Sequence, residues 1–571
     1  MDSPVEGPAG EPGRSRGVQA LNSEEQELTP SQHIARSAGI VSAAVMLSRV
    51  AGLVREIVMA RLFGAGMAYD TFLLGFRIPN MTRDLFAEGA LSSAFIPTFT
   101  EYLSRRGREA AAALANLVST AIIVIVGGFC LLGILFSPLL VDLLAPGFHA
   151  VPGKYELAVR LTRIMFPFLL FVALAAQAMG MLNSCGRFAI PSLASSFFNL
   201  GSLVSGLALG FWAGPYLGIS PIEGMAWGVV CGGMLQFAWQ VPSLRKEGFR
   251  FRLRWDWQDP GLRRIIRMMG PAVIGVAAVQ INVMVTTNFA SRIEDPIRGA
   301  DGPVSWLGYA FRFMQLPLGV FGVAIASATL PTISRSAAAG RIDEFRRTLS
   351  RSLGMVFLMT VPSSVGLIVL GAPMIATIFQ GGRFEAYDTR QTALALSCYA
   401  IGLAGYSAIK VLAPAFYALG DSRTPMMVSL LSIGVNLAAV IALLRYTNLS
   451  HAGLALSTSA VALVSSLVLF AILRGRIDGI YGRDLAASTF RVLAAAGAMG
   501  LAVWALNRRL LALVGDSRLG HAADLAVCIP AGVLLYYGLC RAMRVPELEL
   551  AVSAVTGPLA KWLPGRRGKI Q

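Results

Sequence analysis

Charged residues are scarce in this chain of 571 residues: they make up 14% of it, against about 25% in a soluble domain. Hydrophobic residues make up 55%, and the mean hydropathy is +0.63. This balance excludes an ordinary soluble protein, because so little polar surface could not cover a water-exposed fold. It predicts an all-α polytopic membrane protein.

Cysteine and histidine are also few, with six and four residues. They form no CxxC pair and no Cys/His cluster, so we expect no metal site, no disulfide framework and no cofactor. The sequence contains no Walker A, GxSxG or HExxH motif. These absences argue against an enzyme and against ATP-driven transport by this chain alone.

Long apolar runs are what the chain has in abundance. About fourteen segments reach the roughly 20 residues that cross a bilayer as a helix. We therefore expect six parts in the following order: a disordered cytoplasmic tail at 1–32, a first lobe at 33–245, a basic cytoplasmic linker at 246–259, a second lobe at 260–475, two further spans at 476–545 and a basic cytoplasmic tail at 546–571.

An internal repeat indicates how the spans are arranged. The residues around Pro97 resemble those around Pro331, and those around Pro191 resemble those around Pro425, in both cases 234 positions later. Gly224 has a counterpart 229 positions later. The chain is thus predicted to hold two six-helix lobes related by an axis along the membrane normal, around a central cavity.

Basic residues gather in every second loop, most densely between residues 245 and 267, where eight of them lie. By the positive-inside rule, these loops and both termini face the cytoplasm. Phe249, Phe251, Trp255 and Trp257 alternate with the arginines of this segment. We expect the segment to bind anionic lipid at the membrane interface rather than nucleic acid.

Ionisable residues inside the first two spans are the strongest functional signal. An arginine or aspartate at the centre of a membrane helix costs about 2.5–3.5 kcal/mol on insertion scales. We expect these residues to face a cavity for an anionic ligand, because the guanidinium fork matches phosphate oxygens. Arg49, Arg55 and Arg83 of these spans, together with Arg312 of the second lobe, would make such a cavity electropositive, and Asp70, Glu56 and Glu88 would hold the arginines in place or take part in gating.

Some of these charges have a simpler explanation. Intramembrane salt bridges that only fix helix packing, or positions at helix ends, would account for Glu56, Arg77 and Asp84 equally well. Asp70, Arg77 and Asp84 follow one another at intervals of seven, which predicts one shared helix face. Pro79 is expected to break that helix, as a cavity-lining span allows.

Five motifs together resemble the MurJ/MviN lipid II flippases of the multidrug/oligosaccharidyl-lipid/polysaccharide exporter superfamily. The resemblance covers roughly residues 33–545 and is most specific in the N-terminal motifs. The motifs are Ser48-Arg49-Val50-x-Gly52-x-x-Arg55-Glu56, Phe63-Gly64-Ala65-Gly66-x-x-x-Asp70, Pro79-Asn80-x-x-Arg83-x-x-Phe86-Ala87-Glu88-Gly89-Ala90, Arg312-Phe313-Met314-Gln315-x-Pro317-x-Gly319-Val320-x-Gly322 and Ala418-Leu419-Gly420-Asp421-x-x-Thr424-Pro425.

The resemblance implies a flippase of the bacterial cytoplasmic membrane that carries lipid II, the undecaprenyl-diphosphate-linked peptidoglycan precursor, to the periplasmic leaflet by alternating access. The substrate-binding residues it implies are Arg49, Arg55, Asp70, Arg83 and Arg312, and those expected to gate or support are Glu56, Arg77, Pro79, Asn80, Glu88 and Gln315. It implies a lipid-tail groove formed by the two last spans, and it makes other cell-wall synthesis proteins candidate partners. Gln315 stands where relatives often carry an acidic residue, which argues against a protonation role there. The second lobe offers Asn282, Asn288 and Asn436 but no evident buried carboxylate, so sodium coupling is not expected.

Two other functions fit the residues. An exporter of drugs or of another polyprenyl-linked glycan would share the fold without needing Arg49, Arg55 and Arg83. A non-transporting membrane scaffold is the third candidate, against which the charged spans argue. The energy source, the ion coupling, the precursor's peptide, the resting conformation and the oligomeric state are not encoded in any recognisable motif.

Overall fold

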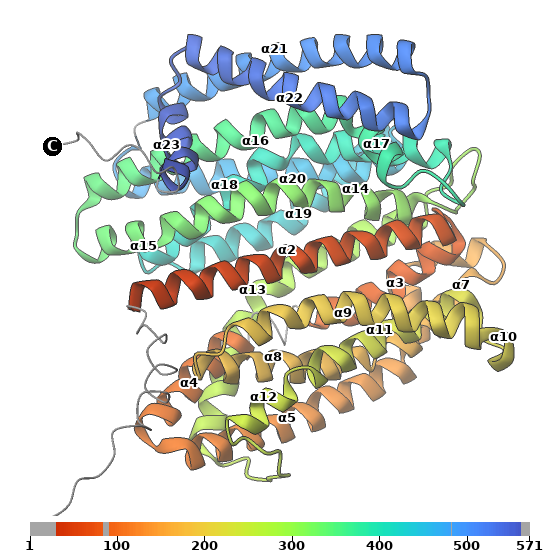
Figure 1. The fold of residues 1–571 in the computed structure, drawn as a ribbon, viewed down its shortest axis with the longest axis vertical. Helices are drawn as coiled ribbons and strands as arrows, with labels where there is room; N and C mark the ends of the chain where they lie inside the picture. The colour runs from red at the N-terminus through yellow and green to blue at the C-terminus, as the bar shows by residue number, and fades with distance from the viewer. Residues whose placement is uncertain (1–29, 84–90, 481, 561–571) are drawn as a thin grey trace, which may run out of the picture.

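The computed structural model describes residues 30–83, 91–480 and 482–560, and this part of the chain is helical, without a β-strand. The expected all-α fold is confirmed. The first lobe occupies the lower half of Figure 1. Its main helices are α2 (Pro30–Phe63), α3 (Met67–Arg83), α4 (Ser92–Arg105), α5 (Gly107–Leu135), α6 (Ser137–Leu144), α7 (Lys154–Met165), α8 (Phe168–Ser184), α9 (Ala189–Leu207) and α11 (Pro221–Ala238).

Short elements join them, namely η2 (Pro146–Ala150), η3 (Ala208–Ala213), α10 (Gly214–Leu217) and α12 (Val241–Lys246). Apart from α13 (Pro260–Ser291), which also contacts α4 and α5, the second lobe lies above the first in Figure 1. It consists of α13, α14 (Pro303–Pro317), η4 (Leu318–Val323), α15 (Ala324–Ala338), α16 (Ile342–Ile378), α17 (Ala386–Ile401), α18 (Leu403–Ala418), α19 (Arg423–Tyr446) and α20 (Ser450–Arg476).

Helix boundaries follow the sequence repeat. α19 begins 234 positions after α9, and Pro191 and Pro425 each stand third in their helix. α20 begins 229 positions after α11, the offset seen for Gly224. Pro97 and Pro331 both lie inside helices, α4 and α15. Arg312 of α14 therefore occupies nearly the same place in its lobe as Arg77 of α3.

Within the described residues, nine helices are long and apolar enough to cross a membrane, or ten if the bent pair α17–α18 forms one span. The expected number of about fourteen membrane spans stays a prediction. α3 continues through Pro79 to Arg83, so the expected break at this proline is wrong. The lost N–H and the ring clash of a proline are tolerated where neighbouring helices support a span, and Pro79 is buried.

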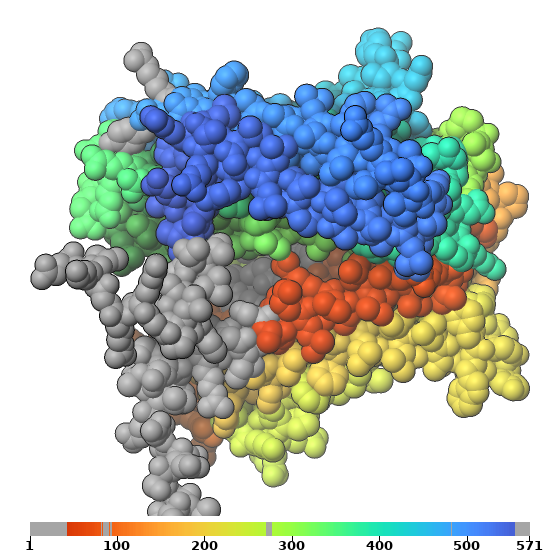
Figure 2. Space-filling model, turned by 45° about the horizontal axis from the view of Figure 1, so that its top comes forward, coloured from red at the N-terminus to blue at the C-terminus, as the bar shows by residue number. Residues whose placement is uncertain are grey.

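Three C-terminal helices cover the outer side of the second lobe. α21 (Gly482–Val514) and α22 (Arg518–Ala542) form a layer on α16, which is the blue surface in Figure 2. α23 (Pro546–Ala560) packs on α16 and lies in the segment expected only as a basic tail. Its buried Glu547 accepts a hydrogen bond from the Ser488 hydroxyl of α21. Residues 1–29 of the expected N-terminal tail lie outside the described residues.

α2 lies between the two lobes and is visible at the surface there in Figure 2. It packs mainly against α9, while Met46, Leu47 and Val50 are more than half exposed. One face of α2 therefore packs on the first lobe, its later residues also contact the second lobe, and Met46, Leu47 and Val50 are open to lipid or a ligand. The charged residues of α2 lie on this boundary.

Candidate functional site

A buried carboxylate joins the two lobes. Glu56 of α2 is 3% exposed, and its Oε1 lies 2.7 Å from Arg312 Nη2 of α14. The same oxygen accepts a hydrogen bond from Arg55 Nη2 at 3.2 Å, and Oε2 accepts one from the Tyr69 hydroxyl at 2.5 Å. We call Arg55, Glu56, Tyr69 and Arg312 the Glu56 cluster. It holds two guanidinium groups on one carboxylate, so it keeps one net positive charge.

The two arginines of this cluster differ in exposure. The Arg55 side chain is 11% exposed and lies over the rings of Phe76 and Phe198, at 5.9 and 5.5 Å. The Arg312 side chain is 41% exposed. Arg312 can therefore meet a ligand while it stays paired with Glu56, whereas Arg55 is enclosed by aromatic rings.

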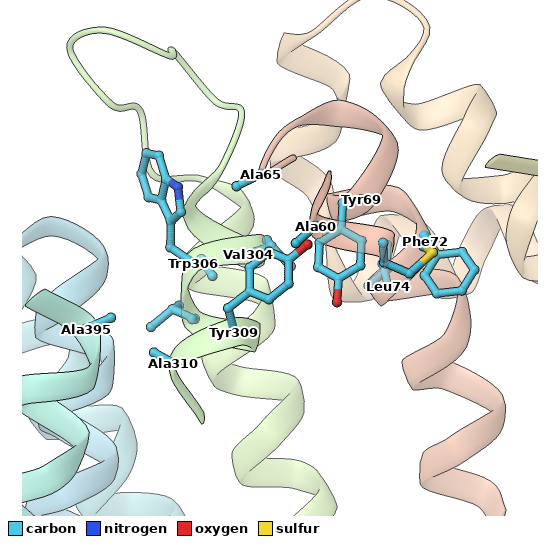
Figure 3. Packing of buried hydrophobic residues seen from close by; sticks show 14 of the residues in the cluster. Ala60, Ala65, Tyr69, Phe72, Leu74, Val304, Trp306, Tyr309, Ala310 and Ala395 are labelled. Carbon is cyan, nitrogen blue, oxygen red and sulfur yellow. The ribbon is translucent and has the colours of Figure 1, made fainter. Parts of the chain in front are cut away.

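Aromatic residues close the Glu56 cluster on one side. Tyr69 stacks on Tyr309 of α14 with ring centroids 4.6 Å apart and planes 11° apart, and Figure 3 shows the two rings next to each other. The Tyr309 hydroxyl donates to the Gly64 carbonyl at 3.1 Å. Both tyrosines are about 1% exposed or less. This stack separates the cluster from the end of the molecule where Gly64 lies.

A second charged group, at that end, joins the lobes. Lys154 of α7 is fully buried, and its Nζ lies 2.7 Å from Asp70 Oδ2 and 2.7 Å from Asp301 Oδ1. Asp70 also accepts hydrogen bonds from the Gly302 and Ser305 amides and the Ser305 hydroxyl, at 3.0, 2.8 and 2.5 Å. We call Lys154, Asp70 and Asp301 the Lys154 lock, and this end of the molecule the Lys154 end.

Asp70 thus lies apart from the arginines with which it was grouped. Its carboxylate is fully buried and fully engaged in the lock, so in this conformation no ligand can reach it. Lys154, which the sequence analysis did not single out, is its partner. A lysine ten residues before the apolar run that begins at Ile164 was the available signal.

Arg77 lies by a different cavity. Its Nη1 donates to the Thr287 hydroxyl of α13 at 2.5 Å. It lines a cavity of about 370 Å³ in the second lobe, together with Lys410 and the polar residues Asn282, Asn436, Ser432 and Tyr399. Arg77 and Asp70 both reach second-lobe residues, as a shared face of α3 predicts, while Asp84 lies outside the described residues.

The remaining expected residues are placed as follows. Arg49 is exposed, and a Cβ atom added to Gly319 of η4 would come within 3.1 Å of Arg49 Nη2, so α2 and η4 meet there across a glycine. Arg83 and Asn80 are half-buried, Pro79 is buried and Gln315 is exposed. Glu88 lies outside the described residues.

The expectation that the second lobe lacks a buried carboxylate is wrong. Asp388 of α17 is fully buried, accepts a hydrogen bond from Trp306 Nε1 at 3.0 Å and lies 3.3 Å from Arg298 Nη2. It belongs to the Lys154 end. Asp295, in the loop at that end, has its pKa lowered: burial raises it, but hydrogen bonds from the Arg298 and Ile297 amides and the Tyr387 hydroxyl outweigh burial.

Comparison with known proteins gives one family. The sequence profile described as "Lipid II flippase MurJ" matches residues 59–519. A Burkholderia cenocepacia protein named "Lipid II flippase MurJ" is 35% identical over 508 residues, which are 87% of this chain and 95% of the relative.

Two solved structures show the same fold. One, described as lipid II flippase MurJ in an inward closed conformation, has a TM-score of 0.71 and 24% identity and covers 88% of this chain and 99% of its own. An inward-facing multidrug resistance MATE family transporter of the MOP superfamily has a TM-score of 0.59 and 16% identity, covering 77% and 94%.

Proposed function

Because the chain belongs to the lipid II flippase MurJ family, we propose that it moves lipid II between the leaflets of the inner membrane by alternating access, with the Glu56 cluster as its diphosphate site. Members of this family are transporters, so the chain is not an enzyme, and it is a multi-pass inner-membrane protein. The observation that carries the site assignment is the pairing of Arg55 and Arg312, from different lobes, on one buried carboxylate.

Charge explains why a diphosphate would replace Glu56 as the partner of the arginines. A diphosphate offers several anionic oxygens to guanidinium groups that share only one carboxylate in the empty protein. The half-exposed Arg312 can turn its free N–H groups to a phosphate, and a bidentate contact of this kind is stronger than a single hydrogen bond. Arg49, exposed on the same helix, adds a further positive charge. Arg83 is proposed as the fourth arginine of the site.

Substrate binding at this cluster would act on the contact between the lobes. Glu56 and Arg312 connect α2 with α14, so a phosphate that replaces Glu56 on Arg312 also weakens a link between the lobes. The ligand then has a different affinity for the two conformations, as alternating access requires.

The direction of transport is proposed from the basic loops. With the basic segments and both termini in the cytoplasm, the Lys154 end faces the periplasm. The Lys154 lock then closes the periplasmic side, and lipid II enters from the cytoplasmic leaflet.

The polyprenyl tail needs an apolar path outside the lobes. α21 and α22 form a layer on α16 and expose large apolar side chains, among them Phe490 at 72%, Leu501 at 71% and Leu534 at 70%. We assign residues 476–545 to the groove for this tail, because burying a long hydrocarbon chain along such a face is favourable.

Complementation and vesicle assays test the assignment. In cells depleted of their own flippase, Arg49→Ala, Arg83→Ala and Arg312→Ala are expected to fail to support cell-wall synthesis at normal expression, and in vesicles to lose at least tenfold in lipid II flipping. Arg335→Ala, which removes an exposed arginine of α15, is the matched control. Full activity of all three site variants would overturn the diphosphate site.

A further inference from the structure

The linker between the lobes covers a second cavity, which no residue of the Glu56 cluster lines. This cavity of about 320 Å³ lies among α5, α8, α11, α12 and the residues that follow α12. Its walls are mainly apolar, with Ile123, Leu174 and Met181 contributed by α5 and α8. Arg245 and Arg250 line it as well, and both are exposed.

The linker is fixed along α5 by its backbone. The Arg252 amide donates to Asn116 Oδ1 and the Arg254 amide to the Thr120 hydroxyl, each at 3.2 Å. Asn116 and Thr120 are one helical turn apart, so an extended segment of the linker runs beside the helix. At a rise of about 1.5 Å per residue, these contacts lie about 14–20 Å from the first residue of α5. α5 has 29 residues and is about 43 Å long, so both contacts lie in the half of the helix that contains its first residue.

The polar groups inside the cavity are already paired. The Ser119 hydroxyl donates to Gln177 Oε1 at 2.9 Å, and Gln177 Nε2 donates to the Ala115 carbonyl at 2.8 Å. Asn116 Oδ1 is taken by the linker. The interior therefore suits a hydrocarbon chain, and these polar groups need no hydrogen bond from a ligand.

The charges at the cavity are not compensated in the same way. Glu247 is the nearest acidic residue in the linker, and it pairs with Arg108 at 3.3 Å and Arg187 at 2.9 Å. In the described part of the chain, neither Arg245 nor Arg250 lies within 4.0 Å of a carboxylate. Within the described residues, two guanidinium groups without an acidic partner thus border an apolar cavity.

We propose that this cavity binds an anionic glycerophospholipid, with its phosphate on Arg245 and Arg250 and an acyl chain between α5 and α8. Exposed Trp255 and Trp257, at 65% and 37%, lie in the linker where aromatic side chains favour the membrane interface. The site does not depend on the transport function. A bound lipid would hold the linker on the first lobe at the point where α13 begins.

Native mass spectrometry of the purified full-length protein tests the site. The probes are dioleoylphosphatidylglycerol, which is anionic, and dioleoylphosphatidylcholine, which has the same chains and no net charge. We expect one phosphatidylglycerol to bind at least tenfold more tightly than phosphatidylcholine, and Arg245→Gln/Arg250→Gln to remove this preference. Arg423→Gln/Arg474→Gln removes two exposed arginines of the second lobe and is expected to keep it.

The apolar part of the site has its own test. Ala112 lines the cavity and is half-buried, so Ala112→Phe is expected to lower retention of both lipids at least fivefold, with a thermal midpoint close to that of the parent protein. An equal loss of preference in the second-lobe control would overturn the proposal, since it would show general attraction to a basic surface. Competition by inorganic phosphate alone, or displacement by equimolar lipid II, would overturn it too.

Discussion

Glu56 is the central residue of the proposed substrate site, because its carboxylate compensates the charge of two arginines from different lobes. Glu56→Gln keeps the size of the side chain and an acceptor for the Tyr69 hydroxyl, but it removes the charge. We expect lipid II to bind at least as tightly to this variant as to the parent, because both guanidinium groups become available. Flipping is expected to fall at least tenfold, because the empty protein loses its link between α2 and α14.

The measurements are lipid II binding in detergent and flipping in vesicles, made on the same preparations. Arg312→Ala is expected to lose both activities, so the two variants should separate binding from transport. Glu109→Gln, at an exposed position of α5, is the control for a lost carboxylate. If Glu56→Gln lost binding in parallel with Arg312→Ala, Glu56 would contact the ligand rather than compensate the arginines.

At this scale the sequence predicted the arginines better than their partners. Charges inside apolar spans are rare and costly, which is why Arg55, Glu56 and Arg312 could be selected from the sequence. Lys154 was not, because its contacts with Asp70 and Asp301 join positions 84 and 147 apart. No local pattern encodes such a contact, and Asp70 was therefore assigned to the wrong neighbours.

At the scale of elements, α3, α7 and the start of α14 form the Lys154 lock. Lys154→Met removes the cation from between two carboxylates and leaves Asp70 with its hydrogen bonds to Gly302 and Ser305. Breaking a buried ion pair costs about 3–5 kcal/mol, and shifting a two-state equilibrium from 99:1 to 1:99 takes about 5.5 kcal/mol. We expect the variant to populate a conformation that is open at the Lys154 end.

Distances between spin labels measure this shift. Labels at Glu156→Cys and Ile297→Cys, which are exposed on opposite lobes at this end, are introduced after the six native cysteines are replaced. A second, longer distance should appear in Lys154→Met. Arg160→Met breaks the ion pair with Glu223 inside the first lobe and should leave the distribution unchanged. An unchanged distance in Lys154→Met would show that the ion pair does not hold the lobes together.

The elements themselves were predicted unevenly from the sequence. The repeat offsets of 234 and 229 reappear in the starts of α9, α19, α11 and α20, because a repeat conserves loop lengths as well as residues. Pro79 shows the opposite case. Its intrinsic tendency to break a helix is overridden by the packing of α3 on α7, which a sequence motif does not contain.

At the scale of the whole molecule, the two charged groups lie at different distances from the Lys154 end, with the Tyr69–Tyr309 stack between them. A site that is closed at one end and approachable from the other is what alternating access requires. The sequence could give the two lobes and the charges near their boundary. Which end is closed depends on contacts between residues of different lobes, so it had to come from the structure.

Gln315→Cys tests this arrangement in the membrane, since Gln315 is exposed one turn beyond Arg312 on α14. In a background without the native cysteines, a membrane-impermeant maleimide is expected to label it in inside-out vesicles and at least fivefold less in intact spheroplasts. Adding Lys154→Met should raise labelling in spheroplasts, because opening the Lys154 end exposes the same residue to the periplasm. Ile297→Cys, exposed in the loop of that end, should be labelled in spheroplasts in both backgrounds and reports on reagent access.

Strong labelling of Gln315→Cys in spheroplasts without Lys154→Met would contradict the prediction in one of two ways. If Ile297→Cys is labelled in spheroplasts as well, the Lys154 end is open; if it is not, the proposed orientation of the protein in the membrane is reversed.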